Sequence, residues 1–235
     1  MKGFMTKVSL LLAATMMSST ACMAQDKVET SVGADLVSNY IWRGQELGGM
    51  SVQPSASVSY KGFSLGAWAS VGLDRNDTKE FDFTLGYSTG GFSVSVTDYW
   101  FDSNGNVDYF KYGAHETAHV FEAQVGYDFG CVAFNWYTNI GGADGVNKDG
   151  KRAYSSYFSL AAPFKLGGLD WSAELGATPW ANSFYGEASS FAVCNLSLSA
   201  SKEIKVTDSF SIPAFGKVTF NPSIGSTFFA FGISL

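Results

Sequence analysis

Alternation of apolar and polar residues with a period of two is the feature that most constrains what this chain can fold into. Residues 52–60, 81–88, 121–129 and 169–178 all alternate in this way, and the second of these segments reads FDFTLGYS. Successive residues of a β-strand point to opposite sides of the sheet, so each segment would have one apolar and one polar face. The pattern therefore predicts an all-β protein.

The chain holds twelve segments of this kind, most of them close to the roughly 9–11 residues with which a tilted strand crosses a bilayer. They are residues 30–41, 50–60, 63–72, 80–88, 91–101, 119–129, 131–140, 153–164, 169–178, 189–200, 208–220 and 226–235. Their connections alternate between long loops (42–49, 73–79, 102–118, 141–152 and 179–188) and short turns (Lys61-Gly62, Thr89-Gly90, Gly130 and 165–168), with an intermediate turn at 201–207. Short turns at one end and long loops at the other are typical of outer-membrane proteins. We expect an antiparallel up-and-down transmembrane β-barrel of about 12 strands, with both termini in the periplasm.

Composition and charge exclude several other classes. The charged fraction is 15%, against about 25% in an ordinary soluble domain, and the formal net charge of −6 argues against binding of nucleic acid. After residue 25 no apolar run approaches the roughly 18 residues of a membrane-spanning helix. A secreted soluble β-sandwich or small-ligand barrel shares the alternation, but neither predicts the alternation of loop lengths.

The first 24 residues have the features of a secretory signal: Lys2 and Lys7, then the apolar run VSLLLAATMM, then small residues up to Ala24. Cleavage there would leave residues 25–235 as the barrel domain, with 13 basic and 21 acidic residues. The alternative is a lipoprotein in which Cys22 is lipidated. Cys131 and Cys194 are expected to be small buried residues, although export would permit a disulfide.

Several segments resemble known sequences. SNYIWRG, at the end of the first predicted strand, resembles the SxYxxRG segment of the Gcw_chp-type family of outer-membrane β-barrel proteins. The stretches HETAHVFEAQVGYDFG (115–130), ELGATPWANSFYG (174–186) and SKEIKVTDSFSIPAFGKVTFNPS (201–223) are similar to those of members in Bacteroides-type bacteria. The resemblance covers most of residues 30–235 and implies an outer-membrane barrel of a Gram-negative bacterium. The family is of unknown function and implies no catalytic residue.

His115-Glu116-Thr117-Ala118-His119 matches H-E-x-x-H, in which two histidines bind zinc and the glutamate is the general base. That chemistry needs a helix, because four steps along a strand separate the histidines by roughly 13 Å. The segment continues as an alternating strand, so polar loop residues are the favoured interpretation. A metal-dependent hydrolase on the outer surface, using His115, Glu116 and His119, is the enzymatic alternative.

The polar faces of the predicted strands supply candidates for the barrel lumen. These are Asp35, Arg43, Asp82, Glu122, Asp128 and Glu174. An acidic lining would favour cations or polyhydroxylated neutral solutes, whereas a plugged lumen would pair the acids with the few basic residues. Asp98 departs from the pattern by lying on an apolar face, which suggests a bulge or a position at the rim.

Aromatic residues near the strand ends are predicted to form girdles at the two membrane interfaces. They are Tyr40, Trp42, Tyr60, Tyr99, Trp100, Tyr127, Phe129 and Trp180.

The sequence thus predicts a barrel that passes or binds a small polar solute, or serves structurally. Its expected partners are outer-membrane lipid and the outer-membrane assembly machinery. We expect no cofactor and no enzymatic activity. The alternative functions are the hydrolase and a secreted soluble β-protein or lipoprotein.

Overall fold

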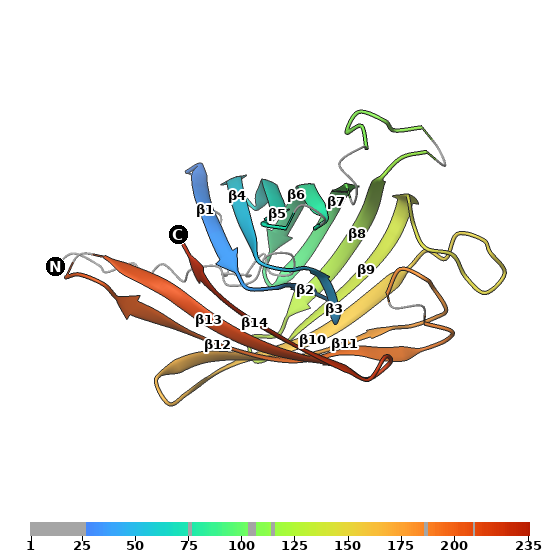
Figure 1. Ribbon diagram of the computed structural model, residues 1–235. Coiled ribbons are helices and arrows are strands. Elements are labelled where there is room, and N and C mark those ends of the chain that lie inside the picture. The colour runs from blue at the N-terminus through green and yellow to red at the C-terminus, as the bar shows by residue number, and fades with distance from the viewer. Residues whose placement is uncertain (1–26, 75–76, 103–106, 114–115, 186–187, 209) are drawn as a thin grey trace.

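Twelve antiparallel strands close into a single ring in the computed structural model (Figure 1), which describes residues 27–235 except 75–76, 103–106, 114–115, 186–187 and 209. They are β1 (Glu29–Val37), β4 (Ser51–Tyr60), β5 (Phe63–Gly72), β6 (Lys79–Thr89), β7 (Phe92–Asp102), β8 (His119–Asp128), β9 (Ala133–Gly142), β10 (Ser156–Leu166), β11 (Leu169–Thr178), β12 (Ala192–Lys205), β13 (Ser211–Asn221) and β14 (Ser226–Ser234). Each strand pairs with its neighbours in chain order, and β14 pairs with β1 to close the ring. The predicted twelve-stranded up-and-down barrel is confirmed, and a single closed ring excludes the two-sheet sandwich.

The described residues include no helix with the length and hydropathy that a membrane crossing would require. The predicted signal sequence, with Cys22, lies outside the described residues.

Short turns connect the strands at one end of the barrel, as predicted. Lys61-Gly62, Gly90-Gly91 and Gly167-Gly168 each have two consecutive positive φ angles. Two-residue hairpin loops of type I′ require this geometry, because its twist matches that of the flanking strands. The second of these turns lies one residue beyond its predicted position. The turn predicted at 201–207 is wrong, because β12 continues to Lys205.

The first connection is not the outer loop predicted for residues 42–49. The first barrel strand ends at Val37 rather than at residue 41, and the chain then forms a separate hairpin of β2 (Tyr40–Trp42) and β3 (Gln45–Gly48). In Figure 1 this hairpin lies within the ring of strands, between the wall of β5–β9 and the wall of β12–β14. We call it the inner hairpin.

The two faces of the sheet are inverted relative to a soluble protein. On β6, Glu80 and Asp82 point inward and are about 95% buried, whereas Phe83 and Leu85 point outward and are 41% and 61% exposed. The same outward exposure recurs around the ring, for example at Val32, Leu65, Val96, Val125, Leu160, Leu198, Phe229 and Phe231. The apolar face is therefore the outside of the barrel.

Polar side chains on the inner face of β7, β8 and β9 bond to one another between neighbouring strands. Gln124 donates hydrogen bonds to the Ser93 hydroxyl (3.1 Å) and the Asn135 side-chain oxygen (3.0 Å), and it accepts one from Ser95 (3.1 Å). A Cβ at Gly126 would collide with this network. The inner face of these three strands is thus covered by hydrogen-bonded polar groups, whereas Ser55 and Ser57, on the inward face of β4, are exposed.

Candidate functional site

The tip of the inner hairpin, Arg43-Gly44, reaches across the barrel interior. Both residues have positive φ (47° and 83°), so the tip is a two-residue turn between the paired residues Trp42 and Gln45. A Cβ on Gly44 would overlap the backbone carbonyl of Cys194 on β12. The Gly44 carbonyl accepts a hydrogen bond from the Asn221 side chain on β13 (2.9 Å). Glycine is needed at this position both for its φ angle and for the close approach to the wall.

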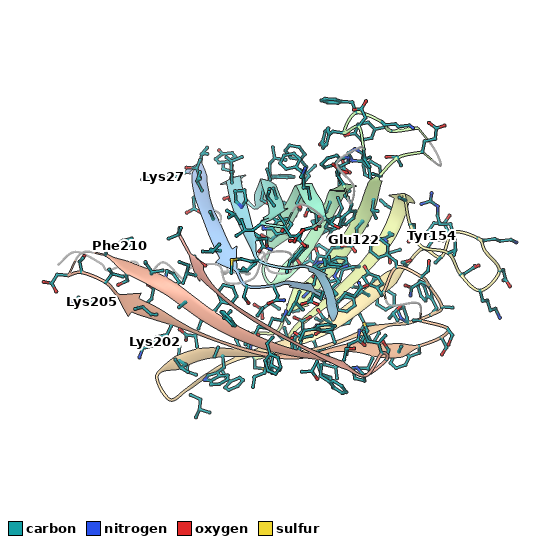
Figure 2. The ribbon with its side chains drawn as sticks, viewed as in Figure 1. Lys27, Glu122, Tyr154, Lys202, Lys205 and Phe210 are labelled. Carbon is teal, nitrogen blue, oxygen red and sulfur yellow. The ribbon has the colours of Figure 1, made fainter. Side chains whose placement is uncertain are left out.

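Arg43 forms an ion pair with Glu122 of β8, in the barrel interior where Figure 2 labels that glutamate. Nη1 donates to Oε2 of Glu122, and Nη2 donates to Oε1 at 2.9 Å, so the contact is bidentate. The two side chains are 1% and 2% exposed. Glu122 also accepts hydrogen bonds from the hydroxyls of Tyr99 (2.9 Å) and Tyr185 (3.1 Å). Four donors therefore compensate the charge of this carboxylate.

Tyr185 reaches this ion pair from the connection between β11 and β12. The Asn182 side-chain oxygen accepts hydrogen bonds from the backbone N–H groups of Phe184 (3.1 Å) and Tyr185 (2.7 Å), and its amide donates to Thr178 (2.6 Å). This turn directs the Tyr185 ring inward, where burial raises the pKa of its hydroxyl well above the usual range. The hydroxyl consequently stays protonated and can donate to Glu122.

Aromatic rings surround the Arg43 guanidinium on the sides that Glu122 does not occupy. Its central carbon lies 3.8 Å from the ring centre of Tyr137, 4.4 Å from that of Trp42 and 5.0 Å from that of Tyr157. Such cation–π contacts contribute about 2 kcal/mol or more when they are desolvated. The ion pair and the rings together form the centre of the buried cluster.

A second cluster of polar side chains surrounds Glu174 of β11. Its Oε1 accepts hydrogen bonds from the Tyr157 hydroxyl (2.8 Å) and the Asn195 amide (2.9 Å), and the same Asn195 amide donates to Tyr157 (2.9 Å). Tyr157 thus contacts both Glu174 and, through its ring, Arg43. The two acids predicted on separate strands belong to one connected network.

Of the remaining candidates for the lumen, Asp82 lies next to this network as the register partner of Tyr99, whereas Asp35 and Asp128 lie elsewhere. Asp35 faces inward beside the β1–β14 closure, where Ser234 is its register partner. Asp82 is 5% exposed on β6, and its Oδ1 has no hydrogen-bond partner among the described residues. Asp128 lies at the end of β8 and accepts a hydrogen bond from the backbone N–H of Gly130 (2.7 Å), which caps a short turn.

The prediction of aromatic girdles was wrong for three residues. Tyr40, Trp42 and Tyr99 are 4–5% exposed and belong to the interior cluster. Residues on the outer face at the strand ends include Tyr60, Tyr127, Phe129 and Trp180, which are 39–64% exposed. A position near a strand end does not by itself determine which face the ring occupies.

His119 and Asp98 contact each other on the outer face of the barrel, which accounts for an acid on that apolar face. The His119 ring is 0% exposed, with Nδ1 2.7 Å from Oδ1 of Asp98 and Nε2 2.6 Å from the Tyr109 carbonyl oxygen. The Tyr112 ring stacks on the imidazole at 4.1 Å between ring centres. His119 thereby attaches the β7–β8 connection to the wall, and the β7–β8 register runs without a bulge through Asp98.

The geometry of the H-E-x-x-H segment differs from that of a zinc peptidase. His119 lies on a strand, and both of its ring nitrogens have partners. Glu116 forms an exposed ion pair with Lys111 (3.2 Å), and His115 lies outside the described residues. No group of three or more metal-binding side chains gathers within the described residues. The hydrolase stays a prediction, and zinc analysis of purified protein would test it.

Both cysteine thiols of the described chain are free. Cys194 is buried against the tip of the inner hairpin, as expected, but the expectation is wrong for Cys131, which is exposed beside a short turn. Sequence reasoning missed the tyrosines of the central cluster, which are Tyr99, Tyr137, Tyr157 and Tyr185. The last of them lies within the ELGATPWANSFYG stretch, which was the only signal that singled it out.

None of the protein families compared with the chain matches it, and no curated protein is significantly similar to it.

Loss of the Arg43 side chain should strongly destabilise the barrel. Arg43→Met leaves the Glu122 carboxylate buried without its cation, and breaking a buried pair in this way costs about 3–5 kcal/mol. Lys165→Met is the control, because it breaks the exposed Lys165–Asp170 pair and should cost less than about 1 kcal/mol. Urea unfolding of purified protein in detergent, followed by tryptophan fluorescence, measures both. Equal losses in the two variants would contradict the central role of the pair.

Gly44→Ala should destabilise the barrel more than Gly90→Ala. Both positions have positive φ, which costs an alanine about 1–2 kcal/mol. Only Gly44 faces a backbone atom at close range, whereas a Cβ at Gly90 meets nothing within 4 Å. We expect an additional loss of about 1–3 kcal/mol at Gly44 in the same unfolding measurement. A smaller loss at Gly44 than at Gly90 would show that the tip does not pack against β12 as described.

Proposed function

We propose that the protein is an outer-membrane β-barrel that binds a small polar solute in a lumen closed by its inner hairpin. The observation that carries the proposal is the buried Arg43–Glu122 pair, which joins the hairpin tip to the opposite wall. A hairpin held in this way obstructs the lumen, so binding is favoured over free passage. The central residues of the proposal are Arg43, Glu122, Tyr185 and the aromatic rings around them.

The inverted surface supports a location in a membrane. Apolar side chains cover the outside of the ring while acids, amides and hydroxyls fill the inside, as in barrels that face lipid and enclose a polar interior. A closed ring leaves no unpaired strand edge, which hydrocarbon would penalise. The alternation of short turns and long connections supports the same location, and short turns on the periplasmic side would put both termini in the periplasm. Outer-membrane lipid and the outer-membrane assembly machinery are the partners that this location implies.

The resemblance to the Gcw_chp-type family is part of the proposal. Its SxYxxRG segment corresponds to Ser38, Tyr40, Arg43 and Gly44, which form the inner hairpin up to its tip. We propose that the family shares this segment because its last two residues, Arg43 and Gly44, hold the inner hairpin in place.

The location is tested by fractionation and gel migration. The protein should sediment with the outer membrane of a Gram-negative host and migrate faster on a gel when it is not heated, because the folded barrel resists detergent. Protein that is fully soluble without detergent would contradict the proposal.

The closed lumen is tested by conductance in planar bilayers. The wild-type barrel should conduct only weakly, whereas a variant in which residues 40–48 are replaced by a Gly-Ser linker should show larger and longer openings. Replacing the exposed loop 147–151 with the same linker is the control and should leave conductance unchanged. High conductance in the wild-type protein would show that the hairpin does not close the barrel.

A further inference from the structure

A cavity of about 240 Å³ lies at the long-loop end of the barrel, beside the inner hairpin. It lies between the hairpin, the β6–β7 wall and the β11–β12 connection. Its lining is mostly apolar, with polar groups at a few places. The lining residues are Trp42, Gln45, Leu47, Thr78, Glu80, Phe101 and Phe184. We call it the mouth cavity. It is distinct from the Arg43–Glu122 pair, in which both carboxylate oxygens already accept hydrogen bonds.

One acid in the mouth cavity, Glu80, has the Tyr40 hydroxyl beside it but no cation among the described residues that line the cavity. Glu80 is 4% exposed, and its Oε2 has no hydrogen-bond partner among the described residues. No basic side chain is among the described residues that line the cavity. The next inward residue on the same strand, Asp82, also has one oxygen without a partner. Burying a carboxylate costs free energy unless a cation or hydrogen-bond donors compensate its charge. A cation bound next to Glu80 and Asp82 would therefore stabilise their charged forms.

Aromatic rings lie next to this acid. The rings of Trp42 and Phe184 pack edge to face, with centres 6.1 Å apart, and Phe101 adds a third ring from β7. Aromatic faces attract cations through their quadrupole, and cages of such rings bind quaternary ammonium groups. A buried carboxylate with one unbonded oxygen beside three aromatic rings fits an organic cation better than a neutral polyol, which would need several paired hydrogen bonds to polar side chains.

We propose that the mouth cavity binds a small organic cation, with its ammonium group against Glu80 and its alkyl surface against Trp42, Phe101 and Phe184. The volume is below the roughly 300–1,000 Å³ of pockets for drug-sized ligands, so the ligand is limited to a few carbon atoms around the charge. This inference rests on the proposed function and specifies the class of solute that the barrel binds.

The test is calorimetric titration of the purified full-length barrel in a non-ionic polyoxyethylene detergent, whose head group carries no ammonium group that could compete with the probe. Choline serves as the probe and 3,3-dimethyl-1-butanol as its uncharged analogue of nearly the same shape. We expect choline to bind and the neutral analogue and glucose to bind at least about tenfold more weakly. Equal affinity for choline and its neutral analogue, or no binding of choline, would overturn the inference.

Two variants locate the site. Glu80→Gln should weaken choline binding by about tenfold or more, because it removes the charge that faces the ligand. Phe101→Leu, which keeps an apolar wall, should weaken it by about three- to tenfold. Glu46→Gln is the matched control, since Glu46 is an exposed acid on the same hairpin, and it should stay within about twofold of wild type. Wild-type affinity in both Glu80→Gln and Phe101→Leu would place the ligand elsewhere and overturn the proposal.

Gel migration of unheated samples shows whether each variant is folded. If Glu80→Gln fails to fold, Phe101→Leu and the comparison with the neutral analogue still decide the question. Because binding is measured on purified barrel in detergent, its failure is distinguishable from a failure of the membrane location, which fractionation tests separately.

Discussion

The bidentate pair between Arg43 and Glu122 is the interaction on which the interior of this barrel depends. It joins residues 79 positions apart and connects the hairpin after the first strand to the sixth strand of the ring. Removing either ion from water costs several kcal/mol, and that cost is recovered only when the geometry is good and the remaining hydrogen-bonding groups are satisfied. The Tyr99 and Tyr185 hydroxyls supply those extra bonds to the glutamate, and aromatic rings surround the guanidinium. Arginine fits this position better than lysine would, because its planar fork matches the carboxylate and its face stacks on aromatic rings.

The number of strands explains why a hairpin is present inside. Side chains of the wall can fill an eight-stranded barrel, whereas barrels of sixteen strands leave an aqueous channel. Twelve strands lie between these cases, and the two ends of this interior differ. Near the short turns, Gln124 bonds to side chains of the two flanking strands, and Ser55 and Ser57 on the inward face of β4 are exposed. Towards the long connections, the inner hairpin supplies the missing volume, and Tyr40, Trp42 and Arg43 pack against the tyrosines of the wall.

Local patterns predicted the wall of the barrel well and its contents poorly. A period of two indicates a strand with two different faces, and glycines indicate tight turns. The strands and most turns were therefore predicted within a few residues. The inner hairpin was missed because Tyr40, Ile41 and Trp42 continue the apolar character of the first strand. Nothing local distinguishes a strand that stays in the wall from one that leaves it. Glu122 and Arg43 were predicted to lie inside because they are charged, but their pairing depends on contacts across the ring. The H-E-x-x-H spacing does not by itself set a geometry: its second histidine opens a strand, as the alternation after it suggested, and Asp98 and the Tyr109 carbonyl contact its ring.

Charge inside the ring is unbalanced, and the imbalance is local. Among the described residues between the strand ends, the inward acids are Asp35, Glu80, Asp82, Glu122 and Glu174, while Arg43 and Lys217 are the inward cations. Glu122 has Arg43, and Glu174 has the Tyr157 hydroxyl and the Asn195 amide. Among the described residues, the acids of β6 have no cation and each has one oxygen without a hydrogen-bond donor, and Glu80 lines the mouth cavity. A buried negative charge that the protein leaves uncompensated must be met by a proton or by a cation from outside. The inner hairpin that the Arg43–Glu122 pair holds therefore borders, at the long-loop end, a region of uncompensated acids. This is the part of the interior where we propose that an external cation binds.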